Sequence, residues 1–263
     1  MDVQLKHIEL VQNTFRMFGD PDSPFWFLGL EESTDPELSA DEQIQAQYRA
    51  SLEQNKLHKV PLSYARVRPT YQRTWGGYIK LLLSVKNNLS PSEKNWTDRD
   101  VMEYQRKRLG ALGKDEFGSC LMELYPLPRK TRSHPWVYSE IANRPGLEFL
   151  SSHSKYKNHI STKNRSEILL SHVEQHKPRV LFCFGADCRK YLGTRLNTKL
   201  EPLSIDNGAG RKHLPAFKSS TGSTQIVFSY HPAAFGVSDD YWRHLGTVVA
   251  NTLPDDEIAI KAA

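Results

Sequence analysis

A short apolar run that ends in two adjacent carboxylates constrains the fold of this chain more than any other stretch. Residues 25–30 read Phe-Trp-Phe-Leu-Gly-Leu, and Glu31 and Glu32 follow directly. A strand that is apolar on both faces is typical of a central parallel sheet covered by helices on both sides. Because ligands of open parallel sheets bind beyond the carboxyl ends of the strands, both carboxylates are expected near a site. Taken alone, they could equally open a solvated acidic loop.

Three further runs predict the rest of the sheet. They cover residues 119–125, 180–185 and 225–230. Segments with helical spacing of apolar residues lie between them, and a first helix is predicted over residues 3–18. The glycine-rich, basic stretch 203–222 is interpreted as a loop or an irregular hairpin. The sequence therefore predicts a three-layer α/β/α fold around a central, mainly parallel four-stranded sheet.

The overall composition indicates one domain. The chain has 263 residues, 38% of them hydrophobic, with no internal repeat and no low-complexity linker, so residues 1–263 are treated as a single domain. No apolar run is long enough to span a bilayer, and the amino terminus lacks the pattern of a secretory signal. We therefore expect a cytoplasmic monomer without a membrane partner.

The three cysteines, Cys120, Cys183 and Cys188, lie in or beside apolar segments. This placement favours reduced, buried thiols. They are too few and wrongly spaced for a structural zinc or iron–sulfur site, so neither a metal nor a cofactor is expected.

A region of about residues 39–75 separates the first strand from the next predicted helix. Its second half, residues 56–75, interleaves basic side chains with aromatic ones and ends with Arg73 and Trp75. Cations meet phosphates and aromatic rings stack on bases, so this mixture is typical of a groove for single-stranded or distorted nucleic acid. A surface loop without a ligand would have the same composition. The formal net charge of +5 permits an anionic partner without requiring one.

A second basic loop follows the predicted strand 119–125. It carries Arg129, Lys130 and Arg132 between prolines. These three cations are candidates for phosphate contacts at the carboxyl edge of the sheet, and the alternative is a solvated loop.

The order of residues at the four strand ends resembles the uracil-DNA glycosylase superfamily. The matching motifs are Gly29-Leu30-Glu31 after the first strand and His231-Pro232-Ala233-Ala234-Phe235 after the last. Residues 177–186 also look like the penultimate strand of that superfamily and its glycine turn. The resemblance spans residues 25 to about 253. The chain lacks the cysteine quartet of the iron–sulfur branch.

The resemblance implies a monofunctional DNA glycosylase that needs no cofactor. Such an enzyme flips a nucleotide out of duplex DNA, or takes it from a single strand, and hydrolyses its N-glycosidic bond to leave an abasic site. Glu31 falls at the position that activates water and faces the sugar cation, with Glu32 as the substitute if the turn is shifted by one residue. His231 falls at the position that stabilises the departing base. Phe235 falls where relatives insert an apolar wedge, and core packing is the alternative for it.

Two departures from the superfamily pattern bear on the substrate. Glu31 stands where relatives usually have Asp or Asn, and Glu123 stands where an Asn reads the edge of uracil. An ionised Glu can only accept hydrogen bonds, which suits the exocyclic amine of cytosine better than uracil O4. Glu123, with Gly29 and Tyr125 beside it, is therefore expected to recognise a cytosine-derived base, such as a glucosylated hydroxymethylcytosine of phage DNA. Tyr125 or Trp75 would stack on the base, or serve only the fold.

Three other functions fit parts of the same pattern. The protein could be an ordinary uracil-DNA glycosylase of base-excision repair, since a protonated Glu123 could still donate. It could be a catalytically silent DNA-binding module of the same fold. It could also hydrolyse a small nucleoside or nucleotide, in which case it would show no salt-dependent affinity for DNA.

Overall fold

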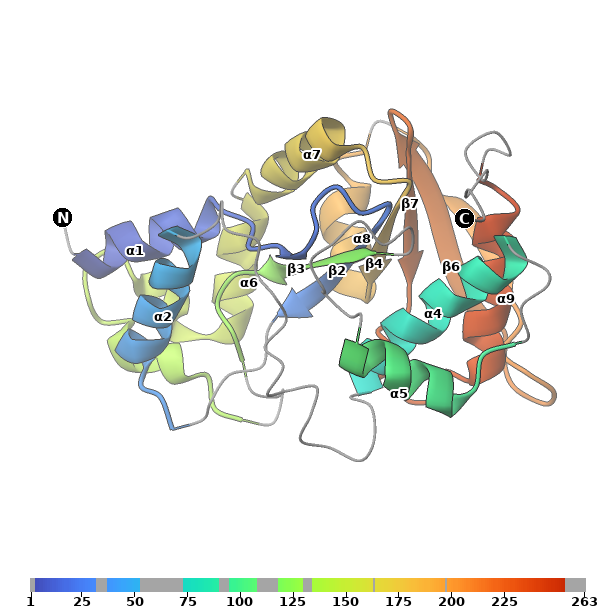
Figure 1. Cartoon of the computed structure of the whole chain (residues 1–263). Helices are drawn as coiled ribbons and strands as arrows, with labels where there is room; N and C mark the ends of the chain where they lie inside the picture. Colours follow the sequence, from blue (N-terminus) through green and yellow to red (C-terminus); the bar gives the residue numbers. More distant parts are fainter. Residues whose placement is uncertain are drawn as a thin grey trace.

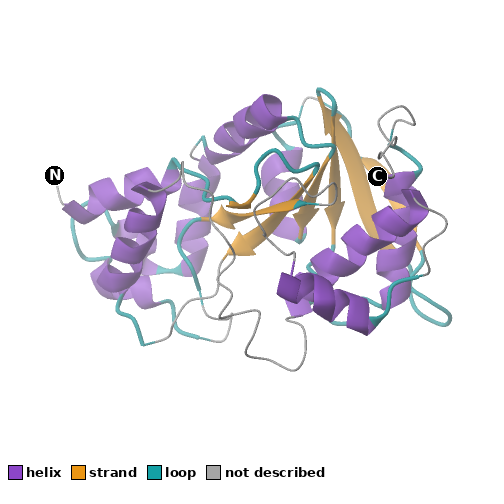
Figure 2. Cartoon of the chain, in the orientation of Figure 1, coloured by secondary structure: helices purple, strands orange, loops and turns teal. Residues whose placement is uncertain are grey.

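The computed structural model describes residues 3–31, 37–52, 73–89, 95–107, 118–129, 134–162, 164–196 and 198–253. Its centre is one mixed sheet of seven strands in the order β1-β3-β2-β4-β7-β6-β5 (Figures 1 and 2). In chain order, the strands are β1 (Phe18–Gly19), β2 (Phe25–Glu31), β3 (Ser119–Tyr125), β4 (Val180–Phe184), β5 (Glu201–Ile205), β6 (Leu214–Thr221) and β7 (Thr224–Ser229).

The four predicted strands are confirmed as neighbours that run parallel. β2 pairs with β3 on one side and with β4 on the other, and β4 pairs with β7. The prediction of a four-stranded sheet is wrong, because antiparallel strands extend it at both edges. β1 pairs with β3, and β6 joins β7 to β5. The strands β5 and β6 are buried on one face at most, so their polar sequence within 203–222 does not have the apolar character of the central strands.

The strand order reverses at one point within the parallel part of the sheet. From β2 the chain moves outward to β3, and from β3 it crosses back over β2 to reach β4. The crevice outside the carboxyl ends of two strands at such a switch point is where open α/β sheets bind ligands. Topology alone thus directs attention to the ends of β2 and β4.

Helices cover both faces of the sheet and enclose two separate cores (Figure 1). Phe25 and Phe27 of β2 pack on one face, while Trp26 and Leu28 pack on the other. The first core contains Phe25 and Phe27 and lies under α4 (Arg73–Leu89), α5 (Asp98–Lys107) and α9 (Asp239–Ala250). The second core contains Trp26 and Leu28. Elements around the second core are α1 (Val3–Gln12), α2 (Ala40–Leu52), the 3₁₀ helices η1 (Val137–Ile141) and η2 (Glu148–Ser151), α6 (His153–Thr162), α7 (Arg165–His176) and α8 (Ala186–Gly193). The three-layer expectation is therefore confirmed.

Two helices begin with reciprocal capping bonds. The Ser39 side chain and backbone amide both bond to Glu42 at the start of α2. Thr97 and Asp100 do the same at the start of α5. The first helix ends at Gln12, six residues before the predicted end at Phe18, because Phe18 belongs to β1.

Arg165, a charged residue, lies in the second core. Its side chain is buried and donates hydrogen bonds to the carbonyl oxygens of Leu124, Gln12 and Thr14 at 2.6, 2.9 and 2.7 Å. These bonds satisfy backbone carbonyl groups at the ends of α1 and β3. Burial lowers the pKa of this guanidinium to about 10.

All three cysteines are free and buried, as predicted. Among the described helices, none has the length and apolar character needed to cross a bilayer.

Candidate active site at the carboxyl edge of the sheet

Glu31 is the last residue of β2 and lies opposite Tyr125, the last residue of β3. β4 ends beside them at Phe184, and β7 ends one strand further on at Ser229. Adjacent strands are roughly 5 Å apart, so side chains from β3, β2, β4 and β7 share one short edge. The switch point between β2 and β4 lies in the middle of this row.

The Glu31 carboxylate is held by a histidine that comes from a distant helix. His153 is the first residue of α6, and its Nε2 atom lies 2.9 Å from Oε2 of Glu31. The Nη1 atom of Arg129 lies 2.9 Å from the other ring nitrogen, Nδ1. Arg129 also donates through Nη2 to the carbonyl oxygen of His134 at 3.1 Å. The side chains of Glu31 and His153 are only 17% and 19% exposed, so this chain of polar contacts is largely shielded from solvent.

A cluster of aromatic rings packs against His153. The ring of Trp136 lies 4.8 Å away between centroids, and the rings of Tyr125 and Tyr156 lie 6.4 and 6.3 Å away. Trp136 and Tyr156 are themselves anchored, because their polar atoms bond to the backbone of Leu150 and Leu127. The imidazole therefore has a fixed plane as well as two polar partners.

A second charged pair lies beside this group. Lys157, one turn further along α6, places Nζ 2.9 Å from Oδ2 of Asp187 in the first turn of α8. The Lys157 ammonium also lies 6.0 Å from the ring centre of Tyr125. Burial raises the pKa of the Tyr125 hydroxyl, and the Asp187 carboxylate adds to the shift. Tyr125 is therefore a neutral phenol with only 5% of its surface exposed.

Glu123 and Gly29 form the next layer of this edge. They are paired across β3 and β2, and the Oε2 atom of Glu123 is fully buried although the residue is partly exposed. A Cβ atom at position 29 would lie 2.4 Å from Oε2 of Glu123 and 2.9 Å from the hydroxyl of Tyr78. Only glycine lets the carboxylate sit against the β2 backbone. Burial raises the pKa of Tyr78, and the charge of Glu123 contributes to this shift.

His231 follows β7 in a tight turn. Its Nδ1 atom accepts a hydrogen bond from the amide of Ala233 at 3.2 Å, and its carbonyl oxygen accepts one from Ala234 at 2.8 Å. Pro232 packs so closely on α4 that a Cβ atom at Gly77 would lie 2.4 Å from Pro232 Cβ. The backbone at His231 is therefore fixed against the helix. In the neutral ring, the Nε2 atom carries the hydrogen and can donate it.

Phe235 and Asn207 complete the segment after His231. Phe235 is fully exposed, so core packing is excluded as its function. The buried Asn207 side chain donates to the carbonyl oxygen of Gly236 at 2.8 Å and accepts from the amide of Ser238 at 2.9 Å. An aromatic side chain thus projects from a segment that is tied down on both sides.

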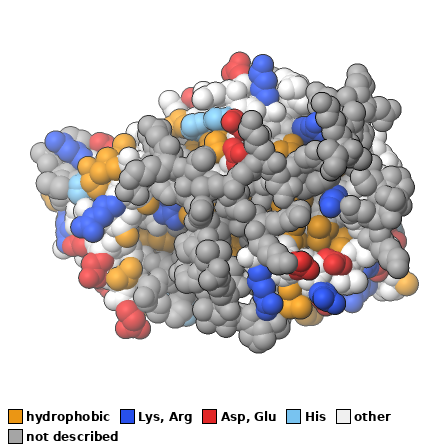
Figure 3. Space-filling model, in the orientation of Figure 1, with side chains coloured by type: hydrophobic (Ala, Val, Ile, Leu, Met, Phe, Trp, Pro, Cys, Tyr) orange, Lys and Arg blue, Asp and Glu red, His pale blue; other side chains and the backbone are white. Residues whose placement is uncertain are grey.

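The other predicted site residues are placed as follows. Arg129 faces His153. Trp75 is half-buried against the first core, and Arg73 is the first residue of α4, with a side chain outside the description. Glu32, Lys130, Arg132 and most of the region 39–75 lie outside the described residues. The described Lys and Arg side chains on the face shown in Figure 3 are scattered among Asp and Glu.

Sequence reasoning missed His153, Trp136 and Lys157. His153 and Glu31 are separated by 122 positions in the chain. No local pattern connects them, and only the docking of α6 beside β2 brings them together.

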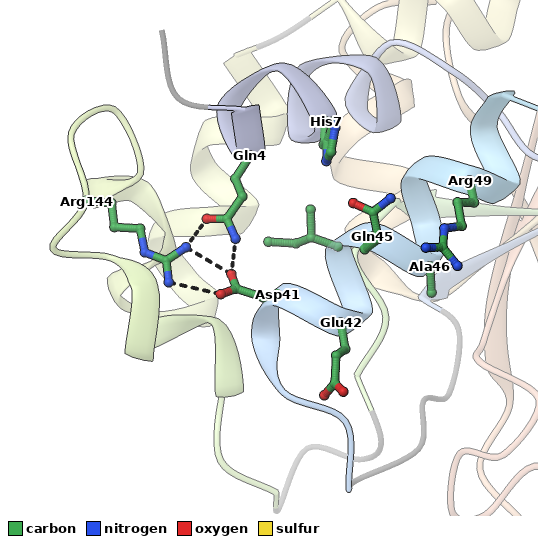
Figure 4. Close-up of a pocket in the computed structure, with 9 residues that line it drawn as sticks. Gln4, His7, Asp41, Glu42, Gln45, Ala46, Arg49 and Arg144 are labelled. Atoms are coloured by element: carbon green, nitrogen blue, oxygen red, sulfur yellow. Dashed lines mark hydrogen bonds and ion pairs between the residues drawn. The ribbon is translucent and has the colours of Figure 1, made fainter.

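Away from this edge of the sheet, a hollow of about 860 Å³ lies between α1 and α2 (Figure 4). Arg144 bonds there to Gln4 and to both carboxylate oxygens of Asp41. The hydrogen bond from Arg144 lowers the pKa of Asp41. Since Arg144 and Asp41 satisfy each other, we interpret this network as a connection between α2 and the turn after η1.

Within the described residues, no cluster of three or more His, Cys, Asp and Glu side chains is arranged to hold a metal ion. Comparison of the sequence with protein-family models and with curated proteins gave no match.

Proposed function

We propose that this protein is a DNA glycosylase that excises a modified cytosine from a flipped nucleotide and leaves an abasic site. The observation that carries the proposal is that a shielded, oriented carboxylate, Glu31, and a fixed histidine, His231, occur at the same edge of the sheet. They stand at the ends of the two strands that flank β4. The resemblance of the Gly29–Glu31 and His231–Phe235 motifs to the uracil-DNA glycosylase superfamily supports the same reaction.

Hydrolysis of an N-glycosidic bond needs stabilisation at both ends of the breaking bond. As the bond between C1′ and the base nitrogen breaks, positive charge develops on the sugar and negative charge on the base. Glu31 stabilises the sugar cation and takes a proton from the water that forms the new C1′–O bond. The departing base carries the electron pair away as an anion, and His231 stabilises this anion by a hydrogen bond from its Nε2–H group, which keeps its proton.

The neighbours of Glu31 suit a flipped base. Glu123 and the backbone of Gly29 form a polar wall. They lie two positions before Tyr125 and Glu31 along β3 and β2. An ionised Glu123 accepts from the exocyclic amine of a cytosine derivative, which is the basis for proposing that class of base. Phe235 is the wedge that fills the gap left in the duplex.

The test is abasic-site formation on duplexes that each carry one of four bases: uracil, hypoxanthine, 5-hydroxymethylcytosine or its glucosylated form. We expect cleavage of the modified cytosines. Glu31→Gln should lower the single-turnover rate on the order of 10²- to 10⁴-fold, and His231→Ala on the order of 10²- to 10³-fold, with the DNA affinity kept.

Cleavage of uracil alone would refute the role of Glu123 and indicate an ordinary repair enzyme. If no base is cleaved while DNA still binds, the chain is a silent binding module. In that case, both substitutions should leave its affinity for DNA unchanged.

A further inference from the structure

Arg129 determines which group donates the hydrogen in the contact between Glu31 and His153. A guanidinium has five N–H donors and no acceptor, so Arg129 can only donate to Nδ1 of His153. Nδ1 must therefore present its lone pair. An imidazole with a lone pair at Nδ1 carries its hydrogen at Nε2, and that hydrogen points at Oε2 of Glu31, 2.9 Å away.

The same reasoning determines what Glu31 does in this contact. A protonated Glu31 could not donate to Nε2, because that nitrogen already bears the hydrogen. Glu31 therefore accepts through Oε2, and its Oε1 atom is left to take a proton from water. The Glu31 carboxylate is thus oriented by the neutral imidazole of His153, and Arg129 bonds to the opposite nitrogen of that ring.

We propose that His153 is the positioning residue of Glu31, held by Arg129 in the Nε2–H tautomer. This inference rests on the proposed function for its catalytic consequence, whereas the hydrogen-bond geometry can be measured without it. It also gives Arg129 a different role from the phosphate contact expected from the sequence. Its guanidinium stabilises a tautomer inside the site.

The packing around His153 supports this role. The imidazole packs against a cluster formed by the rings of Trp136, Tyr125 and Tyr156. The charged groups beside them, Lys157 and Asp187, form their own ion pair at 2.9 Å. Because both ring nitrogens are bonded, the ring cannot rotate without breaking both polar contacts, which is what a residue that orients a carboxylate requires.

The first measurement is the imidazole ¹H–¹⁵N correlation spectrum, assigned by the loss of one ring in His153→Gln. In the wild type, Nε2 should show the shift of a nitrogen that carries hydrogen, and Nδ1 that of a lone-pair nitrogen. Arg129→Met removes the donor to Nδ1, so the Nδ1 resonance should shift while Nε2, still bonded to Glu31, keeps its hydrogen. A wild-type ring with hydrogen on Nδ1 would overturn the proposal, whatever the activity.

The second measurement is single-turnover base excision with three variants. His153→Phe keeps the ring packing and removes the donor, and should lower the rate on the order of 10²-fold while the affinity for DNA stays within about twofold. His153→Gln keeps a donor of similar reach and should recover most of that loss. His159→Phe, on the same helix, is the matched control and should act as wild type.

Thermal unfolding of each variant separates a loss of structure from a loss of orientation. If the wild type is active and His153→Phe is equally fast, the positioning role is refuted and the glycosylase proposal stands. If the wild type cleaves no base, the glycosylase proposal fails, and the tautomer spectrum alone decides whether His153 holds Glu31.

Discussion

At the scale of single residues, the site depends on the absence of one side chain. Gly29 allows the Glu123 carboxylate to lie against β2, with the hydroxyl of Tyr78 on the same spot. Glu123, on the strand next to β2, therefore lies close to Tyr78, a buried residue of α4. A methyl group at position 29 would have to push apart two oxygen atoms and the elements that carry them.

Gly29→Ala should therefore destabilise the protein by about 1–3 kcal/mol, the usual cost of overpacking a core. Base excision should fall further than stability alone explains, since Glu123 is displaced. Urea unfolding and single-turnover kinetics measure the two effects. Gly193→Ala is the control, because its new methyl group would meet only the flexible end of Leu200 at 3.1 Å. Equal stability of both variants would contradict the steric argument.

At the scale of elements, the segment between β7 and α9 is held by contacts that the sequence does not reveal. Asn207, in the loop between β5 and β6, bonds to Gly236 and Ser238, while Pro232 packs on Gly77. Ser238 also caps α9. One loop of the antiparallel extension therefore supports the segment that carries His231 and Phe235.

Asn207→Ala removes four side-chain hydrogen bonds, among them those to the carbonyl oxygen of Gly236 and the amide of Ser238. The expected loss of stability is about 1–3 kcal/mol, with a higher KM for duplex DNA because Phe235 is no longer held. Asn88→Ala, which removes one hydrogen bond from an exposed residue to the carbonyl oxygen of Ser84, should change stability by less than about 0.5 kcal/mol. A rise in KM with Asn88→Ala as large as with Asn207→Ala would argue against the tether.

The link between α2 and the turn after η1 has a defined pH dependence. The pKa of Asp41 is lower in the folded state than in the unfolded one, mainly through the hydrogen bond from Arg144. Its contribution is therefore present above the unfolded pKa of about 3.8 and is lost as the pH falls through the folded pKa.

Asp41→Asn should reduce stability by less than about 1 kcal/mol at pH 7, because the pair is partly exposed and screened. The difference from wild type should shrink as the pH falls and vanish below the folded pKa of Asp41. Urea unfolding at pH 7 and at a series of lower pH values tests this. Glu201→Gln, which disrupts the exposed pair with Lys218, should have a smaller effect at pH 7.

The elements that could be predicted are those whose sequence alone determines their environment. β2 and β4 are apolar on both faces, which only a central strand satisfies. β5 and β6 have one partly covered face and a polar sequence, so their pairing depends on β7 rather than on their own pattern. Glu31 and His231 could be proposed from their places after strands. His153 could not, because its role arises from the contact of α6 with β2.

At the scale of the whole molecule, one exposed aromatic ring and a positive net charge should act independently on DNA. Phe235 and Leu52 are the large apolar side chains exposed among the described residues. Phosphate contacts set the salt dependence of binding, whereas an inserted ring contributes apolar contact without charge.

Phe235→Ala should weaken binding to duplexes that carry the substrate base, with an unchanged slope of log affinity against log salt. Leu52→Ala should alter neither quantity. Fluorescence anisotropy at several salt concentrations measures both. A changed slope for Phe235→Ala, or an equal loss for Leu52→Ala, would refute the wedge.

The reactivity of the buried cysteines can be used to measure how often parts of this fold open. Cys120 lies in β3, Cys183 in β4 and Cys188 in α8, and each thiol has no exposed surface. Burial raises the pKa of all three, so the reactive thiolate is scarce until the chain opens. The rate at which an alkylating reagent labels each thiol therefore counts the openings of a different part of the molecule. Comparing the three rates would show whether the sheet and the helix beside Glu31 open together or in sequence.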